Sequence, residues 1–185
     1  MKISTDAIDN LLALMQKGAD TAYSGERVSQ LEHALQCALF AQESGASPAL
    51  IAASLLHDIG HVLMGGEGEA MAAGIDQQHE QCGADYLAQW FGPTLVEPMR
   101  LHVAAKRYLC ASDADYFARL SPVSVRSLEL QGGPMSQAEA AQFAADPYAQ
   151  DAVRLRHWDE QGKVVGLATQ DLAHFRPLLQ SLRIR

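Results

Sequence analysis

Apolar residues recur at every third or fourth position along most of this chain, and this spacing predicts a protein built from helices. In residues 4–19, for example, Ile8, Leu11 and Met15 would lie on one face of a helix. No stretch shows the alternation of apolar and polar residues that is typical of a β-strand. The pattern therefore predicts an all-α fold with one domain over residues 1–185. Further helices are predicted at residues 29–45, 47–58, 77–92, 97–109, 121–130, 136–145 and 151–162.

The helix predicted at residues 47–58 differs from the others because it is apolar on nearly every side. Ser47 can act as its N-cap, and Pro48 suits the first helical position. A helix without a polar face must be covered by other elements, so we expect it at the centre of the molecule. The glycine-rich residues 59–76 follow, and we expect them to form a loop over a site at the end of this helix.

Charge and composition narrow the range of partners. The formal net charge of −8 argues against a nucleic-acid backbone or an anionic membrane surface as the main partner. A small anionic substrate remains compatible, because its site needs only a few local cations. The longest apolar run, residues 49–56, is too short to cross a bilayer, and residues 1–10 do not resemble a signal peptide. Three widely spaced cysteines, Cys37, Cys82 and Cys110, suit free thiols in a reducing cytoplasm.

The pair His57–Asp58, in the motif HDIGH, lies at the end of the most apolar predicted helix. A carboxylate in such a place is costly to bury unless it is paired or bound to a metal ion. Asp58 has two oxygens, so it could bind one metal ion or bridge two. The alternative is structural, with Asp58 capping a helix and His57 packed in the core.

Three other histidines lie on different predicted helices, and each of them has two interpretations. His33, His79 and His102 are either metal ligands or ordinary packed histidines. We assign His157 and His174 to packing or to the surface.

Two cations lie beside the candidate ligands at helical spacing. Arg156 precedes Asp159 by three residues, so the two share a helix face, either in a site or as a solvated ion pair. Lys106 follows His102 by four residues and is either an anion-binding group or a solvated lysine.

The order of these residues is more specific than any one of them. His33, the pair at residues 57–58 and Asp159 resemble the minimal ligand pattern of the HD-domain superfamily of metal-dependent helical proteins. Histidines between the pair and the last aspartate, here His79 and His102, mark the dinuclear branch of that superfamily. Imidazole and carboxylate ligands without a thiolate suit iron, manganese or zinc.

A narrower resemblance rests on the surrounding motifs. HDIGH has His61 where many HD phosphohydrolases have lysine, and YSGE places Tyr23 three residues before Glu26. With LHVAAKRYL, SPVSVRSLELQGGPM and RLRHWDE downstream, the chain resembles the PhnZ/TmpB-type HD-domain oxygenases over residues 20–165. Those enzymes form an HD-domain helical bundle and cleave carbon–phosphorus bonds with a mixed-valence di-iron centre.

The resemblance implies a role for each matching residue. It implies two iron ions that share Asp58, with the ligands His33, His57, Asp58 and Asp159 for one ion and Asp58, His79 and His102 for the other. It implies a phosphonate site formed by Lys106, Arg156 and Ser124, with Ser127 in reserve, and two further residues near the substrate, His61 and, as a weaker candidate, Gln36. Two cations and a hydroxyl are groups that a dianionic phosphonate needs.

The same resemblance assigns a gate to Tyr23 and Glu26. Tyr23 would occupy the open position of one iron ion until the substrate displaces it. Glu26 would face the cationic amine end of the substrate. The alternative for this pair is an ordinary turn before a helix.

The implied enzyme is a di-iron oxygenase of phosphonate catabolism. It would cleave the C–P bond of 1-hydroxy-2-aminoethylphosphonate, or of its N-trimethyl analogue (R)-1-hydroxy-2-(trimethylammonio)ethylphosphonate. The products would be phosphate and either glycine or glycine betaine. The cofactor would be an Fe(II)/Fe(III) pair with O2 as co-substrate, and the partner would be a small hydroxyphosphonate, not a nucleic acid or a membrane.

Two other functions could use the same residues. An HD phosphohydrolase would use its metal ions as Lewis acids on a nucleotide or phosphate ester, and His61 with the Tyr23–Glu26 pair argues against it. A regulatory HD module would bind a ligand without chemistry, and the complete ligand set argues against that. Iron content and the EPR signal of a coupled mixed-valence pair would separate these functions.

Overall fold

The computed structural model describes residues 6–23 and 26–184, and every helix or strand assigned in those ranges is a helix. The predicted all-α fold is therefore confirmed. In chain order the helices are α1 (Asp6–Lys17), the short 3-10 helix η1 (Gly18–Asp20), α2 (Gln30–Glu43), α3 (Pro48–Leu56), α4 (Ile59–Met64), α5 (Glu67–Ala72), α6 (His79–Leu87), α7 (Pro93–Arg100), α8 (His102–Ser112), α9 (Ala114–Arg119), α10 (Pro122–Leu130), α11 (Gln137–Ala144), α12 (Ala149–Gln161) and α13 (Leu172–Leu182).

Local sequence signals start helices α2 and α3. The hydroxyl of Ser29 accepts a hydrogen bond from the backbone of Glu32, and the Glu32 carboxylate accepts one from the Ser29 N–H, so α2 begins with a capping box. Ser47 caps α3 by accepting a hydrogen bond from the Leu50 N–H, and Pro48 takes the first helical position. Most of α3 is buried, which confirms its prediction as a central helix.

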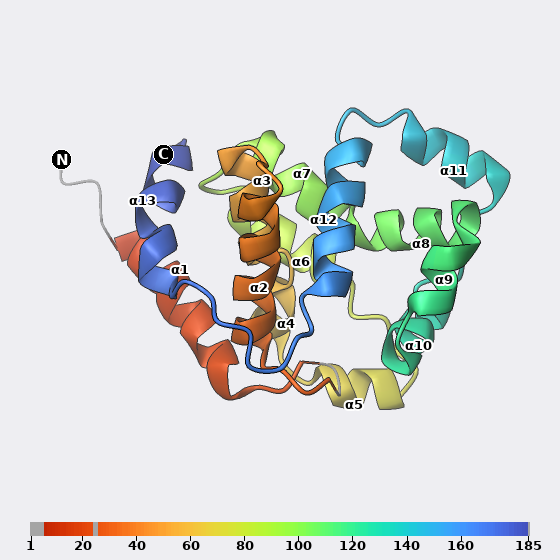
Figure 1. Cartoon of the computed structure of the whole chain (residues 1–185), viewed down its shortest axis with the longest axis horizontal. Helices are drawn as coiled ribbons and strands as arrows, with labels where there is room; N and C mark the ends of the chain where they lie inside the picture. Colours follow the sequence, from red (N-terminus) through yellow and green to blue (C-terminus); the bar gives the residue numbers. More distant parts are fainter. Residues whose placement is uncertain (1–5, 24–25, 185) are drawn as a thin grey trace.

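The helices pack around α3 and α12. Helix α3 contacts α2, α7, α12 and α13, and α12 also contacts α2, α7 and α8. Figure 1 shows α1 and α13 side by side at one end of the molecule, with α8 to α11 at the opposite end. The main hydrophobic core lies between α1, α2, α3, α6, α7, α12 and α13, and two smaller clusters lie under α8 to α11. The junction between these two parts is where the predicted site residues gather.

The structure differs from the sequence prediction at residues 59–76 and 97–109. Residues 59–76 contain two short helices, α4 and α5, instead of a continuous loop. Residues 97–109 are not one helix, because the chain turns at Leu101, whose N–H bonds back to Glu97 and Met99 and ends α7. His102 then starts α8.

Helices α9 and α13 have no counterpart among the predicted elements. Helix α9 has only six residues, and it is started by Asp113, which accepts hydrogen bonds from the N–H groups of Asp115 and Tyr116. Helix α13 contains Pro177, which conflicts with a helical reading of its sequence. Its apolar face nevertheless packs on α1 and α3, and Phe175 and Leu179 are buried there.

All of the described helices are short. The longest, α2, has 14 residues, and no helix in the described ranges is long and apolar enough to cross a membrane.

Candidate active site

Six buried residues from five parts of the chain meet at the junction of α2, α3, α6, α8 and α12. Each of them is at most 8% exposed. They are His33 on α2, His57 at the end of α3, Asp58 between α3 and α4, His79 at the start of α6, His102 at the start of α8 and Asp159 on α12. These are the six metal ligands that the resemblance implies.

Backbone carbonyl groups orient three of the four imidazole rings. The Nδ1 atom of His33 lies 2.8 Å from the Gly162 oxygen, that of His57 2.9 Å from Ser54, and that of His102 2.6 Å from Met99. A carbonyl oxygen only accepts hydrogen bonds, so Nδ1 carries the proton in each ring and Nε2 is directed at the centre of the site. A tautomer fixed in this way is typical of histidines that bind metal ions.

One oxygen of Asp58 faces a first group of ligand atoms. Its Oδ2 atom lies 3.2 Å from His57 Nε2 and 3.6 Å from His33 Nε2. Asp159 completes this group, because its Oδ1 atom is 3.4 Å from His33 Nε2 and its Oδ2 atom is 3.8 Å from His57 Nε2. These four residues surround one point.

The other oxygen of Asp58 faces a second group. Its Oδ1 atom lies 3.2 Å from His79 Nε2 and 3.5 Å from His102 Nε2, and the two nitrogens are 3.1 Å apart. Neighbouring ligands of one octahedral cation are separated by about 3 Å when each bond is about 2.1 Å long. Nitrogens this close beside one carboxylate oxygen suit a shared cation. The donor set and its spacing therefore fit two metal ions with Asp58 between them.

Burial and close pairing shift the pKa values of these groups. Burial disfavours the charged form of Asp58, but His57 and the other imidazoles hold the pKa of its carboxyl well below the ordinary value. Burial also opposes charge on His57, yet Asp58 more than offsets it and raises the pKa of His57 to about 9. Burial, with His61 nearby, lowers the pKa of His79 to about 3. A metal ion binding at His57 would therefore displace a proton at neutral pH.

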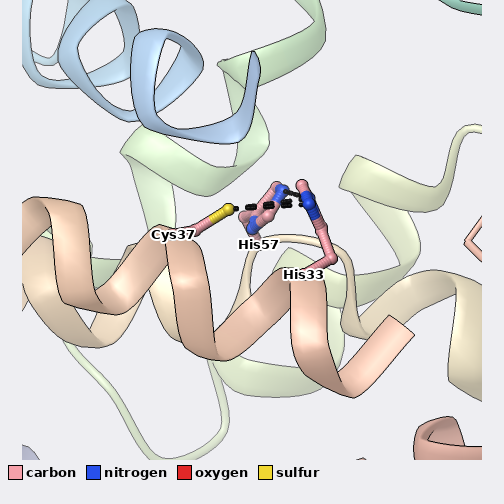
Figure 2. A group of neighbouring side chains, drawn as sticks. All are labelled: His33, Cys37 and His57. Atoms are coloured by element: carbon pink, nitrogen blue, oxygen red, sulfur yellow. Dashed lines mark hydrogen bonds between the residues drawn. The ribbon is translucent and has the colours of Figure 1, made fainter. Parts of the chain in front are cut away.

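Two further groups lie near the predicted ligands. The Sγ atom of Cys37 is 3.6 Å from His33 Nε2, and Figure 2 shows the thiol beside the rings of His33 and His57. Burial and the charge of Asp159 raise the pKa of the Cys37 thiol well above its ordinary value, so Cys37 stays a thiol, whereas a metal ligand is a thiolate. His61 stacks on His79 with ring centroids 3.8 Å apart, close enough to Asp58 to count as a candidate ligand.

Gly60 explains why the motif reads HDIGH. A Cβ atom at this position would lie 2.0 Å from the backbone oxygen of His79 and 2.7 Å from its carbonyl carbon. Helix α4 therefore crosses the first turn of α6 at the one residue without a side chain, and Gly83 gives the matching close approach on α6. This crossing brings His79 to Asp58.

A pocket of about 710 Å³, which includes space open to solvent, lies above these ligands. The segment of residues 59–76 contributes Ala70, Met71 and Ile75 to its wall, so this segment covers the site as expected. The predicted substrate and gate residues that line the pocket are Tyr23, Glu26, His61, Lys106, Ser124, Ser127 and Arg156, and it also reaches Asp58, His79, His102 and Asp159.

The predicted phosphonate-binding cations have different surroundings. Lys106 is buried and donates a hydrogen bond to Ser127 Oγ at 2.8 Å. Arg156 is already bonded on every side of its guanidinium, to Tyr116, to Glu160 and, through Nη1, to Asp159 Oδ2. Arg156 therefore holds the carboxylate of a predicted metal ligand and lines the pocket at the same time.

Gln36 lies outside the residues that line the pocket. Its side-chain amide donates to the Val164 oxygen at 2.8 Å and its amide oxygen accepts from the Val164 N–H at 2.9 Å. In this structure Gln36 fixes the segment that follows α12, and substrate contact by Gln36 stays a prediction.

The gate residues lie on a closed turn between η1 and α2. The Tyr23 N–H donates to the Val28 oxygen, and the Glu26 N–H donates to the Tyr23 oxygen. The Tyr23 ring stacks on His33 at 3.8 Å between centroids, and its hydroxyl lies 3.4 Å from Asp159 Oδ1. Tyr23 thus lies beside the first ligand group, while Ser24 and Gly25 of the YSGE motif lie outside the described residues.

Sequence reasoning missed three residues of this site: Tyr116, Glu160 and Lys163. Lys163 lines the pocket and Glu160 binds both Arg156 and Lys163. A signal for Lys163 was present, because it follows the predicted ligand Asp159 by four residues. Tyr116 comes from the missed helix α9 and carried no such signal.

Two known proteins are similar in sequence to this chain over nearly its whole length. The chain matches the HD domain family over residues 31–146, a range that contains the four histidines predicted as ligands and Asp58 but ends before Asp159. Hydroxymethylphosphonate dioxygenase of Gimesia maris is 47% identical over 181 residues, which cover 97% of this chain and 90% of the relative. The [1-hydroxy-2-(trimethylamino)ethyl]phosphonate dioxygenase (glycine-betaine-forming) of Leisingera caerulea is 41% identical over 169 residues, which cover 91% of this chain and 86% of the relative.

Proposed function

The chain belongs to the HD domain family, and from that premise we propose that it is a dioxygenase that cleaves the carbon–phosphorus bond of a small 1-hydroxyphosphonate. The observation that carries the proposal is the position of Asp58 between two groups of imidazole nitrogens, at the base of a pocket with Lys106 and Arg156 in its wall. The motif-based resemblance to HD oxygenases is confirmed by two relatives that are named as phosphonate dioxygenases.

We infer that two iron ions, as an Fe(II)/Fe(III) pair, are the resident cofactor. His33, His57, Asp58 and Asp159 would hold one ion, and Asp58, His79 and His102 would hold the other. Bound there, the pair would supply the redox chemistry that activates O2. Both atoms of one O2 appear in the products, a carboxylate and phosphate, so the reaction needs no external reductant.

The residues of the chain position and enclose the substrate. Lys106, in its ammonium form, and the hydroxyl groups of Ser124 and Ser127 bind the phosphonate oxygens. Arg156 keeps Asp159 ionised and in place, because its guanidinium holds the pKa of that carboxyl well below the ordinary value. Tyr23 shields the first ligand group from solvent until the substrate enters.

The two relatives differ in the substrate for which they are named. Hydroxymethylphosphonate has no amine, whereas the substrate of the Leisingera enzyme carries a trimethylated one. The aminated substrates that the sequence motifs predict match the second relative. Both kinds of substrate share the hydroxyl and the phosphonate on one carbon, and these are the groups that the proposed site recognises.

The direct test is O2-dependent phosphate release. We expect the protein, loaded anaerobically with iron, to release one phosphate for each O2 consumed from hydroxymethylphosphonate, 1-hydroxy-2-aminoethylphosphonate or its N-trimethyl analogue. An EPR signal of a coupled Fe(II)/Fe(III) pair should accompany activity. Phosphate release without O2, or turnover of nucleotides and phosphate esters only, would show a phosphohydrolase instead.

We expect substrate capture to weaken as the pH rises through about 7. Burial, with Arg156 nearby, lowers the pKa of Lys106 to about 7, so the ammonium that binds the phosphonate is lost above that pH. On the alkaline side of the pH profile, kcat/KM should then fall about tenfold per pH unit. In Lys106→Arg the charge persists at all pH values, so this fall should disappear, while Lys106→Ala should raise KM with the iron content unchanged. A fall that is identical in wild type and Lys106→Arg would assign the titration to another group.

A further inference from the structure

One end of the pocket contains a pair of opposite charges that the ligand and phosphonate assignments do not use. Lys163 Nζ lies 3.7 Å from Glu26 Oε1, and both side chains line the pocket. The same ammonium donates to Ser124 Oγ at 3.1 Å and to Glu160 Oε1 at 3.0 Å. Both side chains are mostly covered, with exposures of 13% for Lys163 and 21% for Glu26, so solvent screens this pair only in part.

The backbone on both sides of Lys163 is fixed by neighbouring residues. On one side, Gly162 packs so closely that a Cβ atom there would lie 2.6 Å from Cys37 Sγ, and its carbonyl oxygen accepts a hydrogen bond from His33. On the other side, Gln36 makes two hydrogen bonds to the backbone of Val164. The position of the ammonium opposite Glu26 is therefore built into the fold and is not an accident of an exposed side chain.

The cation that Glu26 faces in this structure is thus a residue of the protein. A substrate ammonium directed at Glu26 would have to share the carboxylate with Lys163 and would come close to a like charge. A substrate without an amine leaves the pair intact and adds only its phosphonate charge to the site. The charge balance at this end of the pocket consequently disfavours aminated substrates.

We propose that Lys163 is a specificity-determining residue that makes the pocket prefer a 1-hydroxyphosphonate without an amine, such as hydroxymethylphosphonate. This inference rests on the proposed function. Through Ser124, Lys163 also lies beside the proposed phosphonate site, where its charge would favour both kinds of substrate alike, whereas only an aminated substrate meets that charge at Glu26. Removing the charge of Lys163 should free Glu26 to pair with a substrate ammonium.

The test compares kcat/KM for hydroxymethylphosphonate and 1-hydroxy-2-aminoethylphosphonate in iron-loaded wild type, Lys163→Gln and Lys163→Arg. We expect wild type to favour hydroxymethylphosphonate. Lys163→Gln should shift the ratio toward the aminated substrate by at least about tenfold, since a like charge about 4 Å away contributes about that much or more in a partly covered site. Lys163→Arg keeps the charge, so its ratio should stay within about twofold of wild type.

Further controls guard against a structural explanation. Thermal unfolding and iron content should be the same in the three proteins. Calorimetric titration with methylphosphonate and 2-aminoethylphosphonate, which lack the reacting hydroxyl, should show the same shift in preference as the kinetics. Adding Glu26→Gln to Lys163→Gln should cancel the gain for the aminated substrate, because no carboxylate remains to bind it.

The outcomes separate the two proposals. Equal losses on both substrates in Lys163→Gln would mean that Lys163 binds the phosphonate or supports the fold, and would overturn the specificity role. A wild type that turns over hydroxyphosphonates but already prefers the aminated one would overturn it as well. A wild type that releases no phosphate from any hydroxyphosphonate in the presence of O2 would instead remove the proposed function itself.

Discussion

Replacing Asp58 by alanine is expected to empty both metal sites at once, whereas replacing Asp159 should empty only one. Each oxygen of Asp58 faces its own group of imidazole nitrogens, at 3.2 Å from His57 on one side and from His79 on the other. Asp159 lies next to His33 and His57 only. Loss of an outer partner of a metal ligand already costs about 10- to 100-fold in metal affinity or activity, so loss of a shared ligand should cost more than about 100-fold in turnover.

Metal analysis of purified variants checks this expectation. Wild type should contain two equivalents, Asp159→Ala about one, and Asp58→Ala well below one. Asp58→Asn, which keeps the volume of the side chain but lacks the charge, guards against a loss that comes from misfolding. If Asp58→Asn folds and still retains two full equivalents, Asp58 does not bridge the sites.

Gly60→Ala should destabilise the protein and disable the second proposed metal site, although Gly60 is not one of the predicted ligands. The new methyl group would overlap backbone atoms of His79, which cannot move aside as a flexible side chain would. Overpacking of a well-filled interior costs about 1–3 kcal/mol, and a clash with backbone belongs at the upper end or beyond. Helix α6 would have to shift, and a misplacement of about 1 Å can cost about 100-fold in activity.

Gly68→Ala is the matched control, since Gly68 also lies in a short helix, α5, but has no atom within 4 Å of its added Cβ. That variant should be as stable as wild type or more stable by about 1 kcal/mol, because alanine favours helix more than glycine does. Chemical unfolding measures both effects, and metal content shows whether the first ligand group survives in Gly60→Ala. Equal stability of the two variants would mean that α4 and α6 can separate at little cost.

The meeting of the six candidate ligands at one place could be predicted from sequence, because their types and order match the HD pattern. Neither His33 nor His102 alone predicts a metal site, but their order before and after the pair His57–Asp58 is distinctive. What fixes these rings could not be predicted, because the partners are backbone carbonyls of Ser54, Met99 and Gly162, and any residue has a carbonyl. Close contacts between the backbones of two helices could not be predicted either, because they depend on how the helices cross.

Other differences arose where tertiary packing decides the outcome. Residues 97–109 have continuous helical periodicity, yet a turn at Leu101 divides them between two helices. The two hydrogen bonds between the Gln36 amide and Val164 join residues that are far apart in the sequence, and they were not predicted. The ion pair between Glu26 and Lys163 was not predicted, while contact of Glu26 with a substrate amine stays a prediction. Contacts between residues that are far apart in the sequence leave no pattern in the local sequence from which they could be predicted.

The ligands come from five segments between residues 33 and 159, and this has a consequence for how the protein opens. Bound ions would tie together α2, the α3–α4 junction, α6, α8 and α12, and would stabilise the folded arrangement of these segments because the unfolded chain lacks the site. Helices α1 and α13 lie outside that span and pack on each other at one end of the molecule (Figure 1). Amide hydrogens of the two terminal helices should therefore exchange with solvent through local opening that metal loading leaves unchanged, while exchange in the segments between them should slow sharply once the ions are bound.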